Sequence, residues 1–184
     1  TVMFTISSLT NAVEPVIQAR TVTINNNDPI PTVTLTVADN TLVEDGGTTF
    51  VTATLSAASG QNVTVNLLKS GIANPTNDYT LLNAITILAG APSASITLAV
   101  TADTFNELNE TIIVDIDTVD NANEATSTQQ VTVTITNDDA IPTVTLTVIP
   151  TNITEGSASS TVEVKAALSA GSGLALASSA IGGM

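Results

Sequence analysis

The sequence predicts an all-β protein, organised as two-sheet β-sandwich repeats of about seven strands that follow one another end to end. Short runs in which apolar residues alternate with Thr recur along the chain, as expected for strands with one buried face. Hydrophobic residues make up 43% of the chain and aromatic residues only 2%, while 33 Thr residues add β-branched side chains that favour strands. Residues 134–148 also repeat residues 23–37 at a spacing of about 110 residues, the size of one small domain.

Seven strands are predicted between the two copies of this repeated stretch. They span residues 32–37, 49–55, 61–68, 79–88, 94–100, 111–118 and 129–136. Alternation assigns to the core Val33, Leu35, Val37, Val51, Ala53, Leu55, Val63, Val65, Leu67, Ile96, Leu98, Val100, Ile112, Val114, Ile116, Val131, Val133 and Ile135. The fourth run is less regular than the others, and no window shows the apolar stripe of a helix. Several short strands of this kind predict a sandwich.

The repeat divides the chain into one complete unit and two partial ones. Residues 30–140 are expected to form a complete sandwich, residues 1–29 the last strands of a preceding unit, and residues 141–184 the first strands of a following unit. The apolar, Gly- and Ser-rich tail at 170–184 is expected to be a weak strand or a disordered end. Two explanations of the partial units stay open: a piece of a longer array, or ends that donate strands to like chains and build a filament.

Composition excludes several classes of function. The formal charge is −14, from 17 acidic and 3 basic residues, so the chain is a poor partner for nucleic acid or anionic membranes. Cys and His are both absent, which excludes disulfides, thiol nucleophiles, imidazole bases and the usual zinc sites. Only oxygen ligands remain for a metal ion. The sequence has no membrane span. Its acidic, Thr-rich, Cys-free composition is typical of a bacterial surface or secreted protein, and the absence of Cys is also compatible with a cytosolic protein.

The acidic residues are segregated by the predicted topology. If successive strands alternate in direction, one end of the sandwich carries Asp39, Glu44, Asp45, Asp78, Asp103, Glu107, Glu110, Asp138 and Asp139. The other end carries only Asp120 and Glu124. Carboxylates crowded together raise one another's pKa or recruit a cation, and calcium accepts six to eight oxygen ligands in irregular geometry. Because an odd number of strands puts the chain's exit at the acidic end, calcium is expected beside the junction with the next repeat.

Four motifs resemble the Calx-beta repeat and cover residues 30–139. They are Glu-Asp-Gly-Gly at 44–47, Asn-Asp-Tyr at 77–79, Asp-Thr-Phe-Asn-Glu-Leu-Asn-Glu-Thr at 103–111 and Val-Thr-Ile-Thr-Asn-Asp-Asp at 133–139. The resemblance implies an immunoglobulin-like sandwich that binds calcium at one end. The ligand candidates that it carries over are Glu44, Asp78, Asp103, Glu107, Glu110, Asp138 and Asp139.

The chain also departs from the fullest Calx-beta pattern. Thr101 and Ala102 stand where further aspartates precede Asp103, so the resemblance implies fewer ions or weaker sites. The partial units are poorer still, since Asn27 replaces the counterpart of Asp138 in the first and Glu155 is the only matching acid in the last. Neither partial unit is expected to bind calcium well by itself.

The functional hypothesis is a calcium-binding structural module of an extracellular adhesin, fibre or filament, with neighbouring repeats as its partners. Catalysis is not expected, because no His supports a nucleophile and few aromatic residues could support a sugar. Outward Thr faces leave a carbohydrate- or ice-binding module as an alternative, and a regulatory calcium sensor is a third. The sequences at 62–64, 109–111 and 152–154 have the form of glycosylation sites, which arise readily by chance in a Thr-rich chain.

Overall fold

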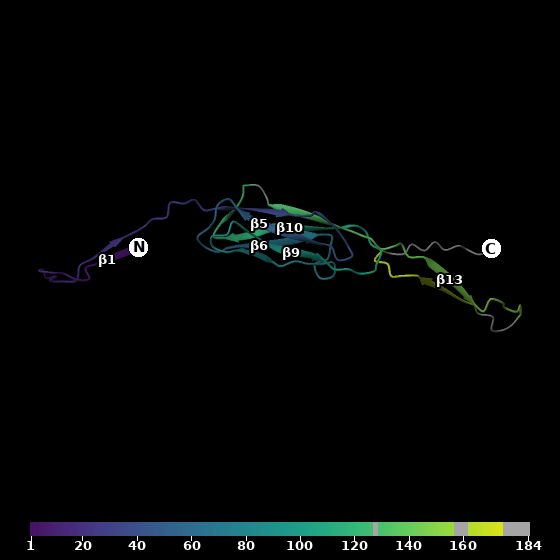
Figure 1. Cartoon of the computed structure of the whole chain (residues 1–184). Coiled ribbons are helices and arrows are strands. Elements are labelled where there is room, and N and C mark those ends of the chain that lie inside the picture. The colour runs from purple at the N-terminus through teal and green to yellow at the C-terminus, as the bar shows by residue number, and fades with distance from the viewer. Residues whose placement is uncertain (127–128, 157–161, 175–184) are drawn as a thin grey trace. The chain divides into compact units, whose positions relative to one another are not determined.

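The computed structural model describes residues 1–126, 129–156 and 162–174 and contains two compact units, Thr1–Ile30 and Pro31–Met184. In the first unit, β1 (Val2–Thr5) pairs antiparallel with β2 (Ala19–Val22), and both strands are exposed on every face. The second unit contains a sandwich of two sheets, drawn with β5, β6, β9 and β10 labelled in Figure 1. No helix is assigned among the described residues, so the prediction of an all-β sandwich is confirmed.

Each sheet of the sandwich has five strands. The first has the order β4 (Thr41–Val43), β12 (Gln130–Thr136), β10 (Glu110–Asp120), β6 (Val63–Gly71), β8 (Ala84–Ile87). The second has the order β11 (Asn123–Glu124), β3 (Thr32–Val37), β5 (Thr48–Leu55), β9 (Ser93–Val100), β7 (Tyr79–Thr80). Beyond the sandwich, β13 (Val144–Ile149) and β14 (Glu163–Leu168) form an antiparallel pair.

The core between the sheets is aliphatic, as the composition predicts. Every residue that alternation assigns to the core is buried or half-buried, and Val33, Val51, Val65, Ile112 and Val133 are fully buried. Period-two alternation succeeds here because both sheets have one wet face and one dry face. Each buried aliphatic side chain contributes about 1.5–3 kcal/mol of transfer free energy to folding.

Short pairings between distant segments are the features that alternation misses. The run at 79–88 is two strands rather than one, because β7 pairs with β9 in one sheet and β8 pairs with β6 in the other. The unpredicted strands β4 and β11 have three and two residues, and each pairs parallel with a remote partner, β12 and β3 respectively. Strands this short are too short for alternation to repeat, so the sequence pattern does not reveal them and only their partners define them.

Two expectations from the sequence fall partly outside these observations. Residues 175–184, most of the apolar tail, lie outside the described residues. The predicted domain division after residue 140 stays a prediction. In the part of the chain that the structure describes, no helix is long and apolar enough to cross a bilayer.

Gly71 closes the end of β6 against β10. Its φ is +116°, a conformation that side chains rarely adopt, and a Cβ at this position would collide with the carbonyl oxygen of Thr111. The same oxygen accepts hydrogen bonds from the amides of Ile72 (2.9 Å) and Ala73 (3.1 Å). The close approach therefore fixes where β10 begins.

Substituting Gly71→Ala is expected to lower the free energy of unfolding by about 3 kcal/mol or more, because backbone strain and a clash with Thr111 combine. Urea denaturation measures the loss. The matched control is Gly90→Ala, since Gly90 also has positive φ (+83°) but nothing lies within 4 Å of an added Cβ. That control should cost about 1 kcal/mol, and equal losses in the two variants would rule out the steric account.

Candidate metal centre

The parallel pairing of β4 with β12 brings Glu44 beside the Asn-Asp-Asp motif. Val43 is paired with Thr136, so Glu44 and Asn137 are the first residues beyond two strands that end at the same edge. The amide of Glu44 donates a hydrogen bond to the carbonyl oxygen of Thr136 at 3.0 Å. Residues about 90 positions apart are thereby held side by side.

A second pairing brings Asp78 to the same edge. Tyr79 pairs with Val100 at the end of β9, and the amide of Thr101 donates to the carbonyl oxygen of Asp78 at 2.8 Å. Asp103 follows two residues later in the chain. The Asp78 carboxylate also accepts a hydrogen bond from the amide of Asn74, which closes the turn before β7. Asp78 therefore reaches the site from just before β7, and Asp103 reaches it from just after β9, the strand paired with β7.

Residues 103–110, here called the acidic loop, complete the edge between β9 and β10. The loop begins with a turn in which the Asp103 carboxylate accepts the amide of Phe105 at 2.7 Å. Its middle is tied to β12 because the amide of Glu107 donates to the side-chain oxygen of Asn137 at 3.0 Å. Glu110 ends the loop as the first residue of β10 and pairs with Ile135.

Asparagine side chains connect the acidic loop to Asp139. The amide nitrogens of Asn106 and Asn137 both donate to the backbone oxygen of Asp139, each at 3.1 Å. The backbone amide of Asn137 donates in turn to the side-chain oxygen of Asn109 at 3.2 Å. These neutral groups hold the loop in place without cancelling any carboxylate charge.

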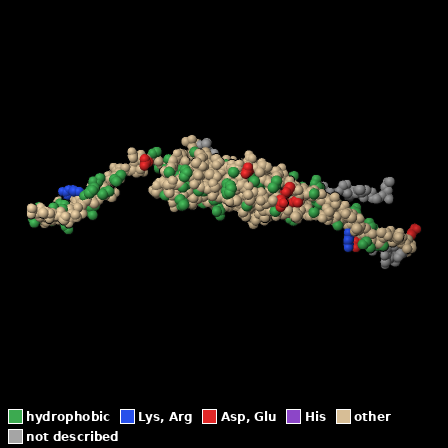
Figure 2. Space-filling view, viewed as in Figure 1, with side chains coloured by type: hydrophobic (Ala, Val, Ile, Leu, Met, Phe, Trp, Pro, Cys, Tyr) green, Lys and Arg blue, Asp and Glu red, His purple; other side chains and the backbone are tan. Residues whose placement is uncertain are grey.

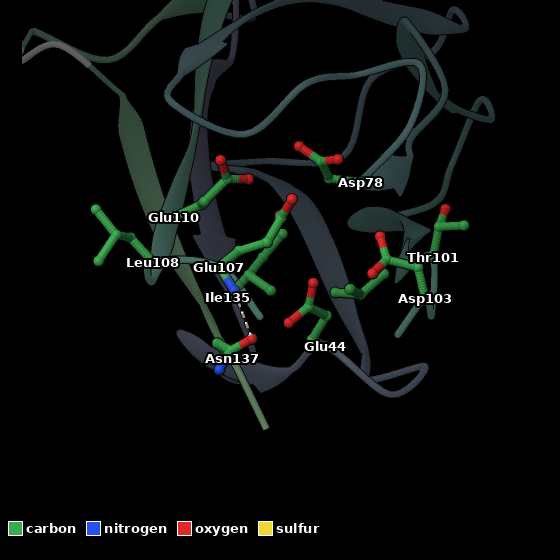
Figure 3. A pocket seen from close by; sticks show the side chains of 10 residues that line it. Glu44, Asp78, Thr101, Asp103, Glu107, Leu108, Glu110, Ile135 and Asn137 are labelled. Atoms are coloured by element: carbon green, nitrogen blue, oxygen red, sulfur yellow. Dashed lines mark hydrogen bonds between the residues drawn. The ribbon is translucent and has the colours of Figure 1, made fainter. Parts of the chain in front are cut away.

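The result is a small pocket at one end of the sandwich, shown in Figure 3. It is lined by Glu44, Asp78, Val100, Thr101, Asp103, Glu107, Leu108, Glu110, Ile135 and Asn137. None of these described lining residues is basic. Glu44, Asp103 and Asp139 each offer one carboxylate oxygen, and these three oxygens lie within 4.8 Å of one another. Figure 2 shows acidic side chains grouped near one end of the sandwich.

The structure separates the acidic residues that the sequence placed at this end. Five of the seven ligand candidates line the pocket and a sixth, Asp139, joins Glu44 and Asp103. Asp138 is exposed and belongs to neither group, although its charge contributes to the raised pKa of Glu44. Asp39 and Asp45 are exposed and outside the pocket, which agrees with a simple solubilising role.

Burial and mutual repulsion raise the pKa values of the carboxyl groups in the pocket. The Glu44 side chain is only 7% exposed, and its burial, followed by the charges of Asp103, Glu107 and Asp139, raises its pKa from 4.5 to about 7. Burial and a hydrogen bond with Asp78 raise the pKa of Glu110 to about 7 as well. The pKa of Glu107 is raised by burial and by Asp103. Protons therefore offset part of the repulsion near neutral pH.

Two oxygens in the site have no hydrogen-bond partner among the described residues. They are Oε2 of Glu44 and Oδ2 of Asp139, and both are buried. An unsatisfied buried carboxylate oxygen costs several kcal/mol unless a cation or donor reaches it. These orphaned oxygens, together with Asp103, form an all-oxygen donor set that fits a hard divalent cation.

Three polar residues of the site were not predicted as candidates. Asn137 lies inside the Asn-Asp-Asp motif, so its sequence position is a usable signal. Thr101 precedes Asp103 by two residues and lines the pocket. The sequence singled it out only as a residue that departs from the Calx-beta pattern. Asn106 is 9% exposed and is buried by tertiary contacts that no local pattern announces.

Fold and site together define an immunoglobulin-like β-sandwich with an acidic, cation-type pocket at one end. No known family matches the sequence, and no curated protein matches it. The structure is similar to the crystal structure of CBD12 from CALX1.2, with a TM-score of 0.51 and 17% identity over 59% of this chain. That match covers 44% of the CBD12 chain, so this chain spans less than half of its length. The likeness confirms the fold that the Calx-beta resemblance implies.

Two further solved structures are similar at lower scores. They are the calcium binding domain CBD12 of CALX1.1, with a TM-score of 0.48, 18% identity and coverage of 55% of this chain and 42% of that chain, and the apo-form Calx CBD1 domain, with a TM-score of 0.47, 16% identity and coverage of 59% of this chain and 99% of that chain.

The raised pKa values predict an unusual pH dependence for the metal-free protein. Because Glu44 and Glu110 have pKa values of about 7 when folded and 4.5 as their reference, the folded state binds more protons between these limits. Stability is then present at low pH and lost as pH rises through 7. Thermal melts in chelator should show a melting temperature at least about 4 °C lower at pH 8 than at pH 5. Glu44→Gln should reduce this decrease of the melting temperature with pH. A melting temperature that rises with pH in the unmodified chain would contradict the prediction.

Proposed function

We propose that this chain is a calcium-binding structural module in an extracellular repeat protein and has no catalytic role of its own. The observation that carries the proposal is the pair of buried, partnerless carboxylate oxygens on Glu44 and Asp139, which lie beside Asp103. Three carboxylates converge there, and no basic residue lines the described pocket. A divalent cation supplies the charge that this arrangement lacks.

Calcium suits the site better than magnesium. Calcium accepts six to eight oxygen ligands and tolerates irregular geometry, whereas magnesium demands a near-ideal octahedron. We assign Glu44, Asp103 and Asp139 as the primary ligands, and Asp78, Glu107 and Glu110 as the adjoining carboxylates that the ion also attracts. Asp138 is exposed and contributes charge in this assignment rather than a direct bond. Asn137 supports the site rather than the ion, since its side-chain oxygen accepts the amide of Glu107.

The structural role is supported by where the site lies in the chain. Asp139 follows β12 by three residues, and β13 begins at Val144, so the ligands adjoin the segment that connects the sandwich to the next strand pair. A bound ion would remove the repulsion among the carboxylates and stiffen this connection. Extracellular calcium modules work with dissociation constants of roughly 10⁻⁴ to 10⁻³ M, so ambient calcium outside a cell suffices.

Three further points support an adhesin, fibre or filament of a bacterial surface as the parent protein. The sequence repeats itself, the chain is strongly acidic, and Cys is absent. The likeness to CBD12 from CALX1.2 supports the sandwich fold of the module and does not indicate which larger protein contains it. Neighbouring repeats are the proposed partners, and strand donation between like chains is the second way in which the exposed pairs β1–β2 and β13–β14 could be used.

The alternative binding functions have less support. An ice- or carbohydrate-binding face requires free hydroxyl groups, but Thr52 is hydrogen-bonded to Ser95 through their side-chain oxygens at 2.8 Å. Thr34 donates to the backbone oxygen of Thr54 at 3.4 Å. A regulatory calcium sensor would use the same pocket, and its distinction from a structural module depends on the parent protein.

Calcium titration by isothermal calorimetry on the full chain tests the proposal directly. A dissociation constant of roughly 10⁻⁴ to 10⁻³ M is expected. Glu44→Gln removes one ligand charge and should weaken binding by at least about tenfold, or about 1.4 kcal/mol. Asp45→Asn is the matched control, because Asp45 is the next residue but is exposed and outside the pocket. Absence of heat from the unmodified chain would sink the proposal; equal losses in both variants would point to general charge screening.

Stiffening of the connection is tested by hydrogen exchange. Addition of calcium should slow amide exchange in the acidic loop and in residues 137–143 by about tenfold, since ligand binding removes local opening. The exposed β1 and β2 serve as an internal control that should not respond. Slowing spread evenly over the whole sandwich would indicate global stabilisation instead of a stiffened connection.

A further inference from the structure

Two segments of the chain close a strand pair in the same way. In the sandwich, the amide of Thr32 donates to the side-chain oxygen of Ser56 and the amide of Ser56 donates to the carbonyl oxygen of Thr32, both at 2.9 Å. After β14, Thr143 and Ser169 exchange the same two hydrogen bonds, again both at 2.9 Å. Ser169 therefore holds the position of Ser56.

The residues that follow these serines also share their local structure. The side-chain oxygen of Ser59 accepts the amide of Gln61 at 3.0 Å, and that of Ser172 accepts the amide of Leu174 at 3.2 Å. Residues 169–174 are thus the counterpart of residues 56–61. The sequence Gly-Ser-Gly at 171–173, here called the docking segment, matches Ala-Ser-Gly at 58–60.

The docking segment lies against the acidic loop. Ser172 forms a parallel β-bridge with Asn106, and Asn106 is only 9% exposed. On either side of that bridge, Gly171 lies against the ring of Phe105 and Gly173 lies against the side chain of Glu107. Three consecutive residues of one segment therefore contact three consecutive residues of the other.

Contact rather than backbone conformation favours glycine at position 173. The φ of Gly173 lies outside the left-handed region, so its backbone would accept another residue. An added Cβ, however, would overlap the carboxylate and the Cγ of Glu107. At the equivalent Gly60, nothing lies within 4 Å of an added Cβ. The same position in two equivalent segments is thus open in one and filled by a pocket side chain in the other.

A groove beside the bridge extends the contact. It has a volume of about 210 Å³ and is lined by Ile72, Glu107, Leu108, Asn109, Glu110, Gly173 and Leu174. Leu174 is the most C-terminal of these residues and faces the groove with Ile72 and Leu108. The contact therefore continues beyond the docking segment, where Leu174 shares this groove with Leu108.

We propose that the docking segment is the surface through which the strand pair β13–β14 attaches to the acidic loop, and that this attachment positions Glu107 for calcium. The proposal rests on the proposed function, because it assigns a regulator to the same site. If docking orders Glu107 within the pocket, docking raises calcium affinity. Calcium must then favour docking by the same factor, since coupling between two binding events is reciprocal.

The decisive experiment is a calcium titration of Gly173→Ala in the full chain. The added Cβ should displace the Glu107 carboxylate and weaken calcium binding by about five- to tenfold, the lower part of the range typical of allosteric coupling. Gly60→Ala, the matched control, should leave the affinity within about twofold of the unmodified chain. Gly171→Ala is a second test variant, because its added Cβ meets the ring of Phe105 and not the Glu107 side chain. It should lower the affinity indirectly, by weakening the docking that positions Glu107.

A double-mutant cycle with Glu107→Gln separates this mechanism from general damage. If Gly173→Ala acts through Glu107, the double variant should bind calcium about as weakly as the weaker single variant, whereas independent effects would multiply. Unchanged affinity in Gly173→Ala and Gly171→Ala, with the unmodified chain binding normally, would overturn the inference and leave the proposed function standing. A multiplicative double variant would overturn the route through Glu107. No binding by the unmodified chain would remove both proposals.

Discussion

The parallel pairing of β4 with β12 is the constraint on which the acidic pocket depends. It places Glu44 beside Asn137 across about 90 residues of sequence, and it leaves the Glu44 carboxylate 7% exposed among other carboxylates. Without that pairing Glu44 would be one more solvated acid in a surface turn, as Asp45 is. Burying this charge costs free energy, and the burial of the aliphatic core offsets that cost. The two sheets that enclose the core hold β4 and β12 in place.

Neutral hydrogen bonds hold the pocket together against the mutual repulsion of its carboxylates. Burial and neighbouring charges raise the pKa of Glu44 and Glu110 to about 7, so protons neutralise part of the cluster at mildly acidic pH. Asn106, Asn109 and Asn137 fix the acidic loop with neutral hydrogen bonds that leave the repulsion in place. The architecture thus concentrates negative charge that no basic side chain among the described pocket residues offsets.

The sequence predicted the long strands well and the short ones poorly. Residues 32–37 were predicted as a strand and form β3. Their apolar and polar side chains alternate strictly, because one side of the strand faces the core and the other faces solvent. The run at 79–88 was predicted as one strand, yet it divides between two sheets, since the chain crosses between them after Thr80. Within the site, carboxylates were found from charge and motif, but Asn106 was not, because its burial depends on contacts with Asp139 and Ser172.

The sequence by itself determined that this chain is an aliphatic β-sandwich with its acids at one end and only oxygen ligands available. Alternation, composition and the absence of Cys and His are local or global properties that need no coordinates. The tertiary structure alone decided which acids converge: Glu44, Asp103 and Asp139 meet, while Asp138 stays exposed. It also decided that a Cβ added at Gly173 would overlap the Glu107 side chain, whereas a Cβ added at Gly60 would have no atom within 4 Å. Both distinctions depend on pairings between remote strands and loops, and such pairings leave no periodic signal in the sequence.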